Sequence, residues 1–142
     1  MSGGDGGSRR DDARSEAREQ AVMLLYEAEQ RTVAPGSLLD ERPVAHGELT
    51  GLLVRGVEAG TTAIDEVIAA HSRGWTVERM PALDRAILRV GVFELRERAE
   101  VPTAVVIDEA VRLAKRFSTD DSGRFVNGVL AAVARATRTD GS

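Results

Sequence analysis

The sequence predicts an all-α domain built around one buried helix, and three observations support this prediction. Alanine, leucine, valine, arginine and glutamate dominate, whereas aromatic residues make up only 4% of the chain, a composition that favours helix over sheet. Apolar residues recur at spacings of three and four in each long segment. One such segment, Ala82–Arg98, is apolar around most of its circumference, which is typical of a helix surrounded by other elements.

Five long helices and two short connecting turns are predicted in chain order. The predicted segments are residues 11–31, 37–41, 48–72, 77–80, 82–98, 104–117 and 121–136. Pro81 occupies the first position of the central helix, where its missing N–H costs no hydrogen bond. The Val101-Pro102 pair separates this helix from the next one. Ser118-Thr119-Asp120-Asp121 supplies caps and acidic residues for the start of the last helix.

Composition sets the domain organisation and excludes several classes of protein. The 142 residues suffice for one domain with its own core, predicted over residues 9–138, between a disordered tail (1–8) and a C-terminal tail (139–142). The chain lacks cysteine, which excludes disulfides and thiolate metal sites and fits a reducing cytoplasm. No signal segment or membrane-length apolar run is present, so no membrane association is predicted. Because the net charge is −4, an anion-binding surface has to be a local patch.

The middle of the chain contains features with more than one interpretation. Gly56 and Gly60 either weaken the second long helix or let a neighbouring helix approach closely. Trp75 is expected to pack over the end of that helix. The β-branched run Val105-Val106-Ile107 is compatible with a strand, but the helical periodicity that follows favours a helix.

Catalysis has little support in the sequence. His46, in a predicted loop, and His71, at the end of a helical stripe, are isolated and more consistent with structural roles. Asp120-Asp121 has no partner ligands for a metal and is better explained by helix capping. No glycine loop of the phosphate-binding kind follows a predicted strand. We therefore predict no enzymatic activity, no cofactor and no metal site.

The first feature that points to binding is an arginine face on the opening helix. Arg10, Arg14 and Arg18 recur at spacings of four, which places their guanidinium groups on one side of the helix. Such groups pair with successive phosphates and stack on bases. Because acidic residues lie among these arginines, composition alone favours an ordinary solvated surface over a nucleic-acid site.

The second feature is the predicted turn between the last two helices. Lys115-Arg116-Phe117 and Arg124-Phe125 surround the start of the last helix and combine basic groups, aromatic rings and a helix N-terminus. This combination suits single-stranded RNA, whose unpaired bases stack on aromatic rings and whose phosphates pair with cations. A helix–helix corner with both phenylalanines in the core explains the same residues equally well.

Three blocks of sequence, in this order, match a known family. They are Ala17-Arg18-Glu19 with Ala21-Val22 and Leu25-Tyr26; Trp75 with Asp84–Arg89 and Phe93–Leu95; and Val101-Pro102 with Val106–Val111, Leu113–Lys115 and Phe125–Leu130. On these blocks the chain resembles the NusB family of transcription antitermination factors, from about Arg14 to Val133. The resemblance implies an all-α fold of two small subdomains, three helices followed by a second bundle.

The resemblance also implies a function and its partners. The family binds the single-stranded boxA sequence of nascent ribosomal RNA together with the small-subunit ribosomal protein that acts as NusE, and the pair helps to assemble an antitermination complex on RNA polymerase. The RNA-binding residues that it implies here are Arg10, Arg14, Arg18, Lys115, Arg116, Asp121, Arg124 and Phe125. The residues expected to contact the ribosomal protein are Glu78, Arg79, Asp84 and Arg85.

The arginine cluster departs from the family pattern. Relatives usually carry a denser cluster before the Ala17-Arg18-Glu19 block, whereas here Glu16 interrupts it and Asp11-Asp12 precede it. Each acid near a phosphate opposes the counterion release that an arginine supplies. We therefore expect weak RNA binding by the isolated protein and useful affinity only with the ribosomal partner.

Two other classes of protein stay open at this point. Some ribosomal RNA methyltransferases carry a NusB-like domain, but they need a downstream catalytic domain with a glycine loop and a cysteine, which these 142 residues lack. A helical adaptor that binds only protein is the second alternative. Charge reversal of Arg14 and Arg18 separates them, because an adaptor would keep its partner and show no RNA phenotype. Some relatives also form homodimers through the surface that otherwise binds RNA, and the sequence leaves this open.

Overall fold

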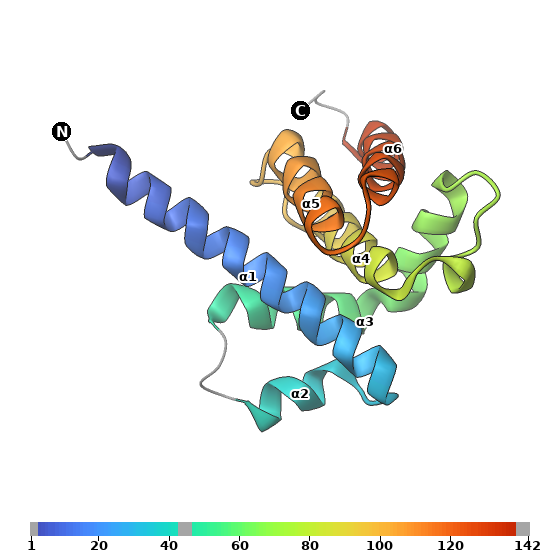
Figure 1. Ribbon diagram of the computed structural model, residues 1–142, viewed down its shortest axis with the longest axis horizontal. Helices are drawn as coiled ribbons and strands as arrows, with labels where there is room; N and C mark the ends of the chain where they lie inside the picture. The colour runs from blue at the N-terminus through green and yellow to red at the C-terminus, as the bar shows by residue number, and fades with distance from the viewer. Residues whose placement is uncertain (1–2, 43–46, 139–142) are drawn as a thin grey trace.

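The computed structural model describes residues 3–42 and 47–138, which form six α-helices and one short 3-10 helix (Figure 1). The elements are α1 (Gly3–Arg31), α2 (Pro35–Glu41), α3 (Glu48–His71), η1 (Val77–Arg79), α4 (Ala82–Glu97), α5 (Thr103–Phe117) and α6 (Asp120–Thr137). Every predicted helical segment is therefore present, and Val105-Val106-Ile107 lies inside α5 rather than in a strand. His46 lies outside the described residues.

The central position predicted for α4 is confirmed. This helix lies between α1–α3 and the α5–α6 pair, and it contacts α1, α3, α5 and α6 (Figure 1). Ile87, Leu88 and Val92 are at most 1% exposed, as expected of side chains packed on several sides of one helix. The predicted all-α bundle of two subdomains around a buried helix is thus the observed architecture.

Both interpretations of the glycines in α3 hold, each at a different residue. A Cβ atom at Gly56 would collide with the ring of Phe93, so this glycine permits close packing of α3 against α4. Gly60 has φ −113° and ψ 16°, a non-helical conformation that kinks α3. The kink follows from the low helix propensity of glycine.

α1 begins earlier than the sequence predicts. It starts at Gly3 instead of near Asp11, so residues 3–8 of the predicted tail are helical. Once the packed part of a helix has formed, each added residue contributes one further hydrogen bond without a new nucleation cost. The N-terminal part of α1 extends beyond the other helices, which leaves Arg9 and Arg10 exposed (Figure 1).

Arg138, at the end of α6, closes the bundle at the end of α4. Its guanidinium donates hydrogen bonds to the carbonyl oxygens of Leu95 (3.1 Å), Val101 (2.6 Å) and Arg98 (3.0 Å). These carbonyls lie in the last turn of α4 and the loop after it, where helical partners are missing. None of the helices in the described part of the chain combines the length and the apolar character needed to cross a membrane.

Candidate nucleic-acid interface

The arginine face of α1 is exposed at one end and buried at the other. Arg10 and Arg14 are exposed, and the Arg14 guanidinium lies 3.8 Å from the Asp11 carboxylate. Arg18, one turn further on, is only 4% exposed. The face therefore presents cations to solvent only along its first part.

Arg18 departs from the RNA-binding prediction because its guanidinium is occupied inside the protein. Its Nε and one terminal nitrogen donate to the two oxygens of Glu94 at 2.8 and 3.0 Å, and Arg98 donates to the same carboxylate at 3.0 Å. Glu94 is 1% exposed. Burial alone would lower the pKa of Arg18, but the hydrogen bonds and charge of Glu94 more than offset this and raise it. Arg18 thus joins α1 to α4 and is almost fully withdrawn from solvent.

The structure brings the two basic segments of the sequence together. The hydroxyl of Ser15 donates to Glu109 at 2.9 Å, and one turn further along α1 Glu19 pairs with Arg116 at 3.1 Å. α1 and α5 therefore run side by side, and the basic end of α5 lies next to α1. A ligand along α1 would meet both regions.

The corner between α5 and α6 is basic and partly aromatic. Lys115, Arg116 and Phe117 are exposed, and the Arg116 guanidinium carbon lies 4.8 Å from the centre of the Phe117 ring. Thr119 caps α6 by accepting a hydrogen bond from the Ser122 amide at 2.9 Å, as the sequence predicts. This cap fixes the corner at which the basic side chains gather.

The first turn of α6 adds one more cation and a second ring to this corner. Asp121 and Arg124 are both exposed and form an ion pair with each other. Phe125 is half-buried and packs against the core. Part of its ring therefore belongs to the core of the helix–helix corner, and part is accessible to a ligand. The predicted RNA residues other than Arg18 are thus at least partly accessible.

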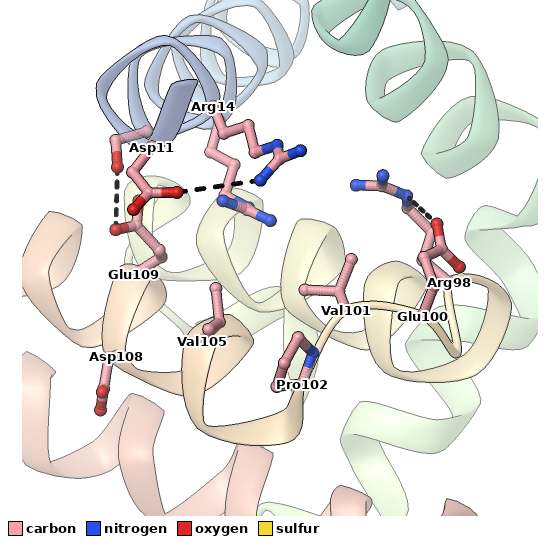
Figure 2. Close-up of a pocket in the computed structure, with 11 residues that line it drawn as sticks. Asp11, Arg14, Arg98, Glu100, Val101, Pro102, Val105, Asp108 and Glu109 are labelled. Carbon is pink, nitrogen blue, oxygen red and sulfur yellow. Dashed lines mark hydrogen bonds and ion pairs between the residues drawn. The ribbon is translucent and has the colours of Figure 1, made fainter. Parts of the chain in front are cut away.

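A cleft of about 410 Å³ separates the exposed part of α1 from the start of α5 (Figure 2). Arg14 and Asp11 line it from α1, Arg98 and Glu100 lie together on the opposite side, Glu109 comes from α5, and Val101, Pro102 and Val105 form an apolar floor, as Figure 2 shows. Because cations and carboxylates are mixed here, the attraction of the cleft for phosphate is weakened. Acids also lie at the α5–α6 corner, where Glu19 pairs with Arg116 and Asp121 with Arg124, so the acidic dilution inferred from the sequence affects both ends of this surface.

The structure corrects the partner-contact prediction at Asp84, which is 3% exposed. Its Oδ2 accepts a hydrogen bond from the Ser122 hydroxyl at 2.9 Å, which ties the start of α4 to the start of α6. Burial raises the pKa of the Asp84 carboxyl, although hydrogen bonds from Ser122 and Ser118 act in the opposite direction. The periodic pattern of α4 placed this acid at a helix start, but packing of α6 covers it.

Arg85 is also largely engaged within the protein. It pairs with Glu29 at 2.8 Å and donates to the carbonyl oxygens of Val77 and Met80 at 2.9 and 2.7 Å. Glu78 and Arg79, in the short helix η1, are exposed. Of the predicted partner contacts, these two are the accessible ones.

Two features of this surface were missed by reasoning from sequence. Glu94 lies in the otherwise apolar face of α4, and an acid at a buried position needs a cationic partner, which could have indicated the pair with Arg18. Trp75, which was expected to pack over the end of α3, is 53% exposed. Its ring lies edge-on to Phe125, with centroids 6.2 Å apart. Within residues 3–42 and 47–138, no group of three or more histidine or acidic side chains could hold a metal ion.

The fold and this surface define an all-helical protein whose basic and aromatic side chains gather at the meeting point of α1, α5 and α6, a surface suited to nucleic acid. Comparison with known proteins agrees with this class. The sequence model of the NusB family matches residues 15–135, and the chain belongs to the NusB family.

Individual relatives cover nearly the whole chain. The transcription antitermination protein NusB of Saccharopolyspora erythraea is 52% identical over 130 residues, which are 86% of each chain. The structure of T. maritima NusB matches with a TM-score of 0.81 and 28% identity, over 89% of this chain and 94% of that one. NusB from a crystal structure of antitermination factors NusB and NusE in complex with dsRNA matches with a TM-score of 0.77 and 29% identity, over 88% and 98%.

Proposed function

We propose that this protein acts in transcription antitermination by binding boxA RNA of nascent ribosomal RNA transcripts together with the small-subunit ribosomal protein that serves as NusE. The observation that carries the proposal is the fold match, over nearly the whole of both chains, to a NusB solved with NusE and RNA. The pair would join an antitermination complex on RNA polymerase in the cytoplasm. We infer that the protein works by binding rather than by catalysis, and that residues 9–138 act as one domain because α4 packs against both halves.

The RNA surface that we propose follows α1 to the α5–α6 corner. It comprises Arg10, Arg14, Lys115, Arg116, Arg124 and Phe125, with Asp121 orienting Arg124. The cations supply phosphate contacts, and Phe125 offers its accessible edge to a base. Arg18 is left out because it is buried and paired with Glu94.

Binding of a boxA RNA with and without the ribosomal protein, over a range of salt concentrations, tests the function. We expect weak, salt-sensitive binding by the protein alone, because carboxylates share the α1 end of the surface with the arginines. The ribosomal protein should raise the affinity. Equal and salt-insensitive affinity in both cases would contradict the proposal.

Charge reversal locates the RNA surface. Arg14→Glu and Lys115→Glu should each weaken boxA binding and lower the salt slope by about 0.7, the value expected for one lost contact with single-stranded phosphate. Arg55→Glu is the matched control, because Arg55 is an exposed arginine on α3 near Asp40. Loss of partner binding with unchanged RNA affinity would identify a protein-only adaptor instead.

Exposed charges on η1 test the partner surface. We propose that Glu78 and Arg79 contact the ribosomal protein, since Asp84 and Arg85 are engaged internally. Glu78→Lys should weaken the complex without changing thermal stability, whereas Glu66→Lys, on the exposed side of α3, should have no effect. Equal effects of the two variants would argue against a contact at η1.

The RNA surface is also where we place self-association of this chain. If two copies meet there, RNA and the second copy compete for the same residues. Light scattering at several protein concentrations should then show that boxA RNA dissociates any dimer. A dimer that binds RNA without dissociating would show that the two surfaces are separate.

A further inference from the structure

A second groove, of about 430 Å³, lies between the end of α3 and the outer side of α6. The two helices contact each other there, next to the α5–α6 corner (Figure 1). Arg73, Arg124 and Arg135 line this groove with Trp75 and Phe125, and none of the described residues that line it is acidic. It therefore differs from the mixed-charge cleft beside α1 and favours an anionic ligand.

Trp75 lines this groove and is largely exposed to solvent. It is the only tryptophan of the chain, and 53% of it is exposed. The turn before it is fixed by a hydrogen bond of 2.7 Å from the Ser72 hydroxyl to the Trp75 carbonyl. Arg73 and Gly74 adopt positive φ values of 45° and 85°, a conformation that is unfavourable for arginine and persists only where the surrounding structure holds it. The indole ring is thus a surface feature on a defined turn.

The α6 side of the groove is a stripe with arginines at its ends and small residues between them. Arg124, Gly128, Ala132 and Arg135 all line the groove, and their spacing places them on one face of the helix. The helical rise separates the two arginine Cα atoms by about 16 Å. A Cβ atom added at Gly128 would meet nothing within 4 Å, so the floor between the arginines is open.

We propose that this groove binds single-stranded RNA that flanks the boxA segment, with a base stacked on Trp75 and phosphates paired with Arg73 and Arg135. Aromatic platforms combined with cations are the usual means of holding single strands without strong sequence preference. The inference rests on the proposed function, because Arg124 and Phe125 belong to both surfaces and make the groove a continuation of the RNA path.

Two RNAs of different length separate the groove from the boxA surface. One carries boxA alone and the other carries several extra nucleotides on each side, both measured with the ribosomal protein present. Trp75→Ala should lower affinity for the long RNA by about tenfold, the loss expected for one stacked base, and leave the short RNA unaffected. Arg135→Glu should also weaken only the long complex and lower its salt slope by about 0.7. Arg55→Glu again serves as the exposed-arginine control, with thermal denaturation to show that each variant folds.

Fluorescence of Trp75 reports the stacking directly. Because this is the only tryptophan, the signal of the wild type minus that of Trp75→Phe belongs to this residue. The long RNA should quench it at low salt with the isolated protein. A long RNA whose flanks keep the sugar–phosphate backbone but lack bases should not quench it, while its affinity should still respond to Arg135→Glu.

The outcomes distinguish this inference from the proposed function. If the wild type binds neither RNA, the proposed function fails. If it binds boxA but Trp75→Ala and Arg135→Glu bind the long RNA as the wild type does, only the groove inference is overturned. Variants that keep both RNA affinities and lose the ribosomal protein would likewise overturn it, by showing that the groove holds protein.

Discussion

The buried pair of Arg18 and Glu94 allows a structural role to be separated from an RNA-binding role. Glu94 is 1% exposed and receives two hydrogen bonds from Arg18 and one from Arg98. Arg18→Met removes two of the three hydrogen bonds to this buried carboxylate, and the bond from Arg98 stays. Removing one partner of a buried ion pair costs about 3–5 kcal/mol, and the remaining bond from Arg98 places the loss near the lower value, about 3 kcal/mol. For a chain of this length that corresponds to a fall in Tm of roughly 10 °C.

The double variant Arg18→Met/Glu94→Met is the decisive comparison. Replacing both charges by apolar side chains of similar size is commonly neutral or stabilising, so most of the lost stability should return. Arg98, whose side chain is 20% exposed, keeps its contact with Glu100 at 3.3 Å. Urea denaturation measures the stability of each variant, and boxA binding with the ribosomal protein measures function.

The effect of each arginine substitution on RNA affinity should depend on whether that arginine is exposed, not on its place in the arginine pattern of the sequence. The stable double variant should bind boxA RNA like the wild type, whereas Arg14→Met should bind it more weakly because Arg14 is exposed. The reasoning is refuted if the double variant regains stability but loses as much RNA affinity as Arg14→Met. It is also refuted if Arg18→Met alone changes stability by less than about 1 kcal/mol.

Three further predictions concern stability. Because the pKa of Asp84 is raised in the folded protein, its contribution to stability is fully present below the unfolded pKa and is lost as pH rises through the folded pKa. In Asp84→Asn, the urea midpoint should therefore change less with pH over that range. An unchanged dependence of the midpoint on pH would exclude this group as the cause. Gly56→Ala should destabilise the fold by about 1–3 kcal/mol, because the added methyl group collides with Phe93. Gly128→Ala should stabilise the fold by about 0.5–1 kcal/mol, because nothing lies near the added methyl group. Denaturation midpoints of the two variants that move in the same direction would contradict this packing. Arg138→Ala should cost about 2 kcal/mol by freeing carbonyls at the end of α4, and Arg138→Lys should restore little, since an ammonium group cannot reproduce the guanidinium geometry.

The helices themselves were predictable because their signals are local. Apolar spacing identified the five long helices, and Pro81 and Thr119 marked helix starts that the structure retains. α4 could be recognised as the central helix because a segment that is apolar on most sides has to be covered. The start of α1 was placed too late, since the extension of a helix beyond its packed part leaves no hydrophobic pattern.

The candidate site was only partly predictable, because exposure depends on what packs against each residue. Arg14 and Arg18 are equivalent in the sequence pattern, yet only Arg18 lies where α4 provides a carboxylate 76 positions away. In the sequence, Asp84 resembles a free acid at a helix start, but in the structure it accepts a hydrogen bond from the hydroxyl of Ser122. By itself, the sequence determined the helices, the central position of α4 and the family. Tertiary packing alone decided which charged groups neutralise one another in the interior and which reach solvent, because that choice depends on contacts between segments far apart in the chain.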